Sequence, residues 1–252
     1  MSRQALDAAV EAARAAGAIA LKYFRGGFEV TLKTDATPVT QADREAEQAI
    51  VEILGRTFPD YGVLGEEFGG HGSREVRWII DPIDGTKNFV RGIPVWATLI
   101  GLEEHGEVTV GVIHNPVTGE LYTARRGAGA FLNGERIRVS TIAELGRATL
   151  IHAGLKLYRE AGRWEPFVRL VDATERQRGF GDYSGYGIVA EGKAEIYVEL
   201  DLKPWDLAPC KVLVEEAGGR FTDLEGRPTI YSGTALATNG RLHDAVLALL
   251  RP

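Results

Sequence analysis

The sequence predicts a layered protein with an α+β first half and an α/β second half. Two helical patterns of apolar residues open the chain, a series of short strand patterns follows them, and helix and strand patterns alternate from about residue 145. No linker rich in Pro, Gly and Ser separates the halves. We therefore expect an N-terminal α+β half at residues 1–142 and a C-terminal α/β half at residues 143–252, packed as one unit.

The first half is expected to begin with two helices and to continue as a sheet. Apolar residues at helical spacing from Leu6 to Phe24 predict a helix that ends near Gly26. Thr40 and Asp43 resemble a capping box at the start of a second helix. Short strand patterns separated by turn residues then predict an antiparallel sheet. Its strands are expected at 61–64, 76–80, 95–102, 108–113, 121–124 and 137–139.

The second half alternates between the two kinds of element. Strands are expected at 148–151, 194–199 and 220–222, and helices at 160–173, 184–191, 206–217 and 242–250. This alternation predicts a second sheet with helices on its faces.

The composition limits the location and the partners of the protein. Because 29 Lys and Arg face 35 Asp and Glu, the net charge is -6, which argues against nucleic acid as the main partner. No apolar run approaches the ~18 residues of a membrane span, so we expect a cytoplasmic protein with no membrane partner. The single cysteine, Cys210, excludes an intramolecular disulfide and lies in an apolar helical pattern, where a thiol is usually buried and inert.

The segment from Trp78 to Phe89 carries the most informative polar residues. A buried strand is expected to end at Asp81, Pro82 to force a tight turn, and Asp84 to cap a short helix. Such a turn would direct two carboxylates to one point beside the N–H groups of a helix start. Because Mg²⁺ prefers carboxylate oxygens and helix N-termini favour phosphate, a metal ion and an anion could meet there.

Two further acidic segments lie far from this turn in the sequence. Glu66 and Glu67 follow a predicted strand, so one of them can point into a cleft. Asp206 lies at the start of a predicted helix. Taken singly, paired aspartates are usually helix caps and loop glutamates are usually solvated. The order of the three segments along the chain is what indicates a shared site.

These segments resemble the signatures of the inositol monophosphatase superfamily. The GEE, DPIDGT and WD segments of that superfamily occur here in order, at 65–67, 81–86 and 205–206. The segments 39–43 and 215–219 also resemble the family, so the resemblance covers nearly the whole chain. It implies a layered α/β/α/β/α sandwich of the inositol monophosphatase and fructose-1,6-bisphosphatase type, with the active site between the halves.

The resemblance also implies two or three Mg²⁺ ions per active site. One ion would be held by Glu66, Asp81 and the backbone carbonyl of Ile83. A second would be held by Asp81, Asp84 and Asp206, and Glu66 would help to hold a more labile third. Metals that share the phosphate oxygens neutralise charge and lower the pKa of bound water, so no covalent enzyme intermediate is required.

The resemblance also assigns residues to phosphate binding and to the attacking water. The N–H groups of Gly85 and Thr86, beside Asp84, would receive the phosphate group. Glu66 and the hydroxyl of Thr86 would orient the metal-bound water, and Asp43 would support Thr86. The expected protein is thus a magnesium-dependent phosphatase of a small soluble phosphate monoester. The family also implies a homodimer and inhibition by lithium.

Other classes of function fit the sequence less well. In haloacid-dehalogenase phosphatases the nucleophilic and acid/base aspartates are two residues apart, whereas Asp81 and Asp84 are three apart. The five histidines lack the spacing of a zinc hydrolase, and no serine-hydrolase elbow or phosphate-binding Gly-rich motif occurs. A non-catalytic dimeric scaffold of the same fold is the non-enzymatic alternative.

Residues outside the metal turn indicate the substrate. Lys87, where inositol phosphatases usually have threonine, and the segment 178–182 with Tyr186 resemble the histidinol-phosphatase branch, an activity of histidine biosynthesis. Histidinol phosphate carries an ammonium and an imidazole, so Asp182 or Glu199 would pair with its positive charge. Alternatively, Asp182 caps a helix and Glu199 accepts hydrogen bonds from substrate hydroxyls. We rank histidinol phosphate first, inositol 1-phosphate or a broad range of sugar phosphates second, and nucleotide 3'-phosphates third.

Overall fold

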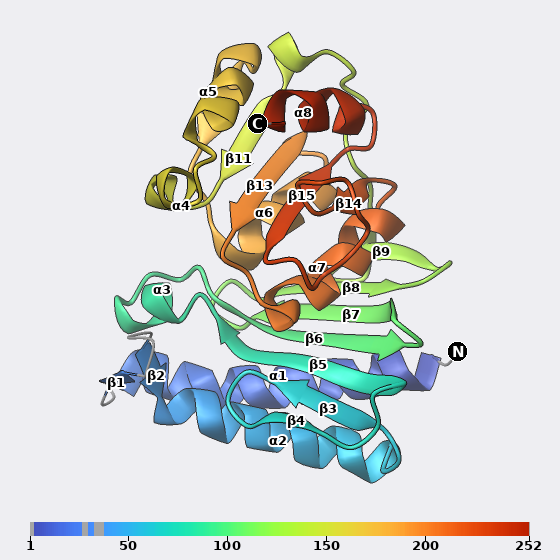
Figure 1. Cartoon of the computed structure of the whole chain (residues 1–252). Coiled ribbons are helices and arrows are strands. Elements are labelled where there is room, and N and C mark those ends of the chain that lie inside the picture. The colour runs from blue at the N-terminus through green and yellow to red at the C-terminus, as the bar shows by residue number, and fades with distance from the viewer. Residues whose placement is uncertain (1–2, 27–29, 33–37, 252) are drawn as a thin grey trace.

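Five layers of helices and sheets, in the order α/β/α/β/α, stack on one another in this computed structural model (Figure 1). The structure describes residues 3–26, 30–32 and 38–251. The layered architecture predicted from the sequence is therefore confirmed. The proposed boundary at residues 142 and 143 lies between the last strand of the first sheet and the first strand of the second.

Two helices, α1 (Arg3–Gly26) and α2 (Gln41–Thr57), form the first outer layer, close to their predicted bounds. Helix α1 buries a stripe of alanines, which are good helix formers and small enough for close packing. Together with Ile50 and Leu54 of α2, this stripe packs on Trp78 of the sheet. The proposed capping box cannot be assessed, because the side chain of Thr40 lies outside the described part. The small strands β1 (Val30–Leu32) and β2 (Pro38–Thr40) connect the two helices.

The second layer is a sheet of eight strands. They are β3 (Gly62–Gly65), β4 (Gly69–His71), β5 (Val76–Asp84), β6 (Ala97–Glu104), β7 (Glu107–Asn115), β8 (Glu120–Arg125), β9 (Gly129–Leu132) and β10 (Glu135–Ile137). Their order is β10-β9-β8-β7-β6-β5-β3-β4. All neighbours are antiparallel except β3 and β5, which are parallel. The predicted purely antiparallel sheet was thus wrong at this pair, because the chain first doubles back along β4.

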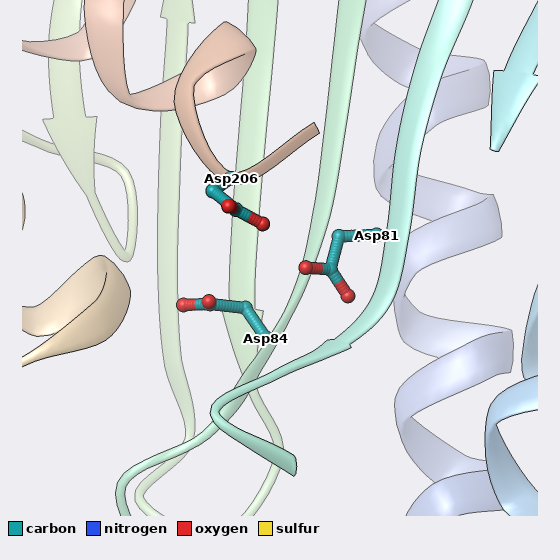
Figure 2. Close-up of side chains that lie close together, drawn as sticks. All are labelled: Asp81, Asp84 and Asp206. Carbon is teal, nitrogen blue, oxygen red and sulfur yellow. The ribbon is translucent and has the colours of Figure 1, made fainter. Parts of the chain in front are cut away.

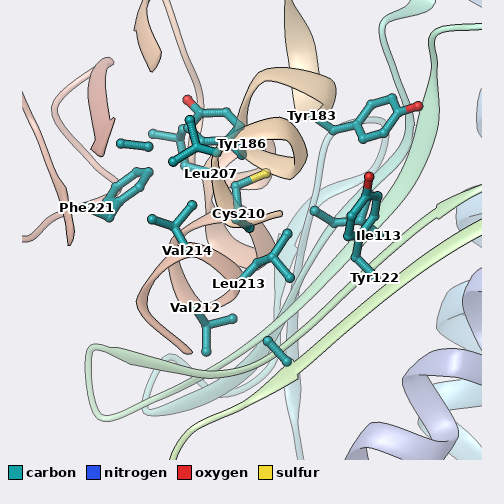
Figure 3. Close-up of a cluster of buried hydrophobic side chains, with 14 of the residues drawn as sticks. Ile113, Tyr122, Tyr183, Tyr186, Leu207, Cys210, Val212, Leu213, Val214 and Phe221 are labelled. Carbon is teal, nitrogen blue, oxygen red and sulfur yellow. The ribbon is translucent and has the colours of Figure 1, made fainter. Parts of the chain in front are cut away.

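The middle layer consists of α6 (Asp182–Ala190) and α7 (Pro204–Glu216), which lie between the two sheets (Figure 1). Their apolar side chains form the largest core cluster with residues of both sheets, and Cys210 is buried in it as predicted (Figure 3). Gly101 of β6 and Gly111 of β7 lie opposite each other beneath α7. A Cβ atom on Gly101 would lie 2.7 Å from Cβ of Ala208, so the two glycines let α7 approach the sheet closely.

The fourth layer is a five-stranded sheet, and three helices cover its outer face. The strands are β11 (Thr149–His152), β12 (Arg176–Arg178), β13 (Ile196–Leu200), β14 (Arg220–Thr222) and β15 (Thr234–Thr238), in the order β12-β11-β13-β15-β14. The covering helices are α4 (Leu155–Glu160), α5 (Trp164–Ala173) and α8 (His243–Leu250), with the 3₁₀ turn η1 (Leu145–Arg147) before β11. Only β11, β12 and β13 are parallel, and ligands commonly bind at the carboxyl ends of such strands.

Most predicted elements are present, but their bounds differ from the expected ones by a few residues. The helix expected at 160–173 is α5, which begins only at Trp164, because Gly162 takes a left-handed conformation (φ 66°) and ends the preceding helix α4, which was not predicted. The strand expected at 137–139 is β10, which lies at 135–137. Within the described residues, no helix has both the length and the apolar character required to cross a membrane.

Candidate metal centre

Three aspartates from distant parts of the chain meet between the halves (Figure 2). Asp81 and Asp84 come from β5, and Asp206 comes from the first turn of α7. One carboxylate oxygen from each lies within 4.8 Å of the others. The structure therefore brings together three of the residues that the sequence nominated as metal ligands.

Strand β5 does not end at Asp81, as the sequence analysis expected. It continues to Asp84, with a shift of register against β6 between Asp81, opposite Leu99, and Asp84, opposite Ala97. Pro82 causes this shift because it has no N–H to donate to the ladder. The Ile83 N–H instead donates to Oδ1 of Asp81 at 3.0 Å. This irregularity lets both carboxylates reach the same point.

Asp84 does not cap the following short helix α3 (Thr86–Val90). The N-cap residue is Gly85, whose φ of 82° is a conformation that glycine adopts at little cost. The Asp84 carboxylate instead accepts a hydrogen bond from the N–H of Tyr183, at 2.6 Å, at the start of α6. The metal cluster is thereby connected to the middle layer.

Asp206 combines a structural role with its place in the cluster. Its Oδ2 accepts the N–H of Lys203 at 2.7 Å, as the acidic member of a capping box does. This hydrogen bond fixes the side chain at the start of α7, where the second oxygen can serve as a ligand.

The electrostatics of the cluster fit a divalent cation. Burial raises the pKa of Asp81 well above its usual range, and the charges of Glu66, Asp84 and Asp206 raise it further. Burial raises the pKa of Asp206 to about 7. Among the described residues that line the surrounding pocket, Lys87 is the only basic one. Because buried carboxylates need compensating charge and magnesium prefers oxygen ligands, the residues present suit a bound Mg²⁺.

Glu66, in the loop after β3, lies near the cluster but is not one of the three residues whose oxygens lie within 4.8 Å of one another. It is half-buried, lines the pocket and is close enough to raise the pKa of Asp81. The loop is held by Glu47, which the sequence analysis missed. The buried Glu47 carboxylate accepts the N–H groups of Glu67, at 2.9 Å, and Phe68, at 3.0 Å. Its position on the apolar face of α2, one residue after Ala46, was the available signal.

Ile83, Gly85 and Thr86, which the sequence analysis nominated, also line the pocket. The Thr86 hydroxyl donates to the Ile83 carbonyl at 2.9 Å, and that carbonyl keeps a second lone pair. Asp43 is buried in the first turn of α2 and does not line the pocket.

The pocket has a volume of about 240 Å³, and its lining also includes Asp182, at the start of α6, and Glu199, near the end of β13. Burial raises the pKa of Glu199 to about 8, and the charge of Asp182 adds to this. Burial raises the pKa of Asp182 to about 6, and the positive charge of Lys87 limits the rise.

Asp182 is not the cap of α6, because the N-cap is Gly181 and no side-chain bond caps the helix. Its Oδ2 accepts a hydrogen bond from the Asn88 side chain at 2.9 Å. Sequence reasoning also missed Asn88. A helix of five residues gives no periodicity from which the direction of Asn88 could be inferred.

This chain is similar in sequence and in fold to known proteins. The model of the inositol monophosphatase family matches residues 1–252. The histidinol-phosphatase of Mycobacterium tuberculosis is 47% identical over 229 residues, which are 88% of each chain. The Nus factor SuhB of Xylella fastidiosa is 40% identical over 90% of this chain and 84% of its own. The crystal structure of the extragenic suppressor protein SuhB from Bartonella henselae superimposes with a TM-score of 0.91 at 34% identity, over 97% of both chains. The chain therefore belongs to the inositol monophosphatase family.

Proposed function

We propose that this protein is a magnesium-dependent phosphatase that hydrolyses histidinol phosphate to histidinol. The observation that carries the proposal is the convergence of Asp81, Asp84 and Asp206 within 4.8 Å, in a pocket that has only one basic lining residue among those described. A buried anionic cluster of this kind binds a phosphate dianion only when cations lie between the two.

The metal ligands would be the three aspartates, Glu66 and the Ile83 carbonyl. Two or more Mg²⁺ ions bound there would neutralise the phosphate and lower the pKa of bound water. The chain itself supplies Lys87, which lines the pocket from the first turn of α3, as a further positive charge for the phosphate.

Glu66 and Thr86 are proposed to orient the attacking water. Since the Thr86 hydroxyl donates its proton to the Ile83 carbonyl at 2.9 Å, its oxygen remains able to accept a hydrogen bond from the water. The Glu66 carboxylate, held in place by the Glu47-bound loop, can accept the second water proton. Asp43 is proposed to support Thr86 from α2.

Histidinol phosphate is proposed as the substrate because two acidic residues outside the metal cluster also line the pocket. Asp182 and Glu199 would face the ammonium group of this substrate, which a neutral sugar alcohol lacks. The similarity to the Mycobacterium tuberculosis histidinol-phosphatase supports this choice. A homodimer and lithium inhibition remain predictions from the family resemblance, and a cytoplasmic location remains a prediction from the sequence composition.

The test is a parallel assay of phosphate release from histidinol phosphate, inositol 1-phosphate, fructose 1,6-bisphosphate and adenosine 3',5'-bisphosphate, with Mg²⁺ and with a chelator. We expect the highest kcat/KM for histidinol phosphate and no release in the chelator. A higher value for inositol 1-phosphate would reassign the substrate but leave the phosphatase proposal intact. A folded protein that releases phosphate from none of the four compounds would support the non-catalytic alternative.

A further inference from the structure

We propose that Asp201 is a specificity-determining residue that, together with Glu199, binds the ammonium group of the substrate. This inference rests on the proposed function, because it concerns the part of the same pocket that receives the group attached to the phosphate. It assigns a role to a residue that the sequence analysis did not single out.

Asp201 lines the pocket two residues after Glu199, where β13 ends. Its side chain is exposed, and no hydrogen bond or ion pair joins it to another residue in the described part of the chain. Asp182 differs in this respect, since its carboxylate accepts a hydrogen bond from Asn88 and lies in the field of Lys87. Of these two pocket aspartates, Asp201 has the carboxylate without a partner among the described residues, and it would join Asp182 and Glu199 in facing the ammonium group.

A buried acceptor beside Asp201 also lacks a partner. Glu199 is only 6% exposed; its Oε1 accepts the N–H of Asp182 at 3.3 Å, whereas its Oε2 has no hydrogen-bond partner within the described residues. Glu199 lines the pocket. A buried carboxylate oxygen without a donor is costly, and a ligand that brings N–H donors removes the cost. An ammonium group has three N–H donors and one positive charge, so it can serve Glu199 and Asp201 together.

The backbone of Asp201 is a third, supporting observation. Asp201 has a left-handed conformation, φ 63°, which an aspartate adopts at higher cost than glycine. The conformation is imposed from both sides, because Leu200 pairs with Thr234 in the sheet and the N–H of Leu202 donates to Gly233 at 3.1 Å. Replacement of Asp201 by glycine should therefore remove the charge without backbone strain.

The experiment compares the wild type with Asp201→Asn and Asp201→Gly on three substrates. Histidinol phosphate and phosphoethanolamine each carry an ammonium group two carbons from the phosphate oxygen, whereas glycerol 1-phosphate is neutral at that end. We expect KM to rise about fivefold for both ammonium substrates, with kcat little changed, because an exposed ionic contact contributes equally to ground-state and transition-state binding. The parameters for glycerol 1-phosphate should stay within about twofold of the wild type.

Two controls separate recognition from folding and from general charge effects. Asp201→Gly should keep a Tm at or above that of the wild type, because glycine accepts the left-handed backbone. Asp172→Asn makes the same charge change on the exposed surface of α5, away from the pocket, and should leave all three KM values unchanged.

The outcomes for the two proposals are distinct. An Asp201→Asn variant with wild-type KM for phosphoethanolamine and histidinol phosphate would overturn the role of Asp201, and so would an equal rise in KM for glycerol 1-phosphate. A wild type that prefers glycerol 1-phosphate to histidinol phosphate would reject the proposed substrate. Even then, the phosphoethanolamine data decide whether Asp201 recognises an ammonium group.

Discussion

The carboxylate of Glu47 accepts a hydrogen bond from the backbone N–H of Glu67 at 2.9 Å, which joins the outer helix α2 to the loop that carries Glu66. A second bond, from the N–H of Phe68 at 3.0 Å, makes the attachment bidentate. Burial raises the pKa of Glu47, whereas the two N–H donors lower it. A residue remote from the pocket thus positions a proposed metal ligand, as partners behind a metal site commonly do.

We expect Glu47→Gln to weaken magnesium binding about tenfold, since loss of a supporting hydrogen bond typically costs 10-fold to 100-fold in metal affinity. The glutamine side chain has one acceptor oxygen, so one of the two loop N–H groups loses its partner. The measurement is the Mg²⁺ concentration for half-maximal activity, with Tm recorded in parallel. Glu52→Gln, the same change at an exposed site on α2, is the control. An unchanged Mg²⁺ requirement in a less stable Glu47→Gln variant would assign Glu47 a purely structural role.

The place of Asp206 beside Asp81 was accessible from the sequence, because the acidic segments occur in the order typical of the family. The local geometry around Asp84, in contrast, could not be predicted from the sequence. Asp84 looked like a helix cap, but its carboxylate bonds the N–H of Tyr183, a residue 99 positions away in the chain. Such a tertiary bond leaves no trace in local spacing.

The parallel pairing of β3 with β5 also escaped prediction, for a related reason. Strand β4 has the sequence Gly-Gly-His, which lacks the β-branched and aromatic residues that mark strands. Its pairing with β3 depends on the register of Val63 with His71, not on its own propensity. The sequence pattern therefore predicts a loop at the position where the chain forms strand β4.

We expect Asp206→Asn to lower kcat/KM by at least about 100-fold and to stabilise the metal-free protein. Asparagine can still accept the Lys203 N–H but removes one charge from a cluster in which burial and like charges raise the pKa values. Thermal unfolding with a chelator and with Mg²⁺ measures the stability of the metal-free and metal-bound protein. The variant should have a higher Tm than the wild type in the chelator and a smaller rise on addition of Mg²⁺. Asp60→Asn, at an exposed site, should change neither value. Equal Mg²⁺-induced shifts in Asp206→Asn and the wild type would remove Asp206 from the metal site.

His243 is expected to make folding sensitive to acid. It is fully buried, and its Nε2 and Nδ1 lie 2.9 Å from the hydroxyls of Thr222 and Thr238. Burial lowers its pKa to about 4; the charge of Arg220 lowers it further, and that of Asp244 opposes the shift. Since the unfolded chain binds the proton more tightly, this contribution to stability is complete above about pH 6.5 and is lost as the pH falls towards 4. Its size is at most about 3 kcal/mol.

Urea unfolding between pH 4 and pH 7.5 tests this expectation. His243→Gln should be less stable than the wild type at pH 7. The difference should shrink as the pH falls, because only the wild type loses stability when the buried imidazole is protonated. His105→Gln, in the exposed turn between β6 and β7, is the control. A difference between His243→Gln and the wild type that is constant across this range would show that His243 does not titrate with folding.

Finally, the close approach of α7 to the first sheet is expected to set the position of Asp206. A Cβ atom on Gly111 would lie 2.8 Å from the Pro209 carbonyl oxygen and 2.6 Å from Cγ1 of Val212, so Gly111→Ala must displace α7. Overpacking of this kind costs about 1–3 kcal/mol, and because Asp206 is carried by the first turn of α7, magnesium affinity should fall as well. Gly55→Ala is the matched control, since nothing lies within 4 Å of a Cβ there and alanine favours helix α2 by about 1 kcal/mol. Urea unfolding measures the stability of both variants, and Mg²⁺ titration measures their magnesium affinity. A Gly111→Ala variant that is destabilised but binds Mg²⁺ as tightly as the wild type would mean that Asp206 is positioned by its Lys203 hydrogen bond alone and not by the packing of α7.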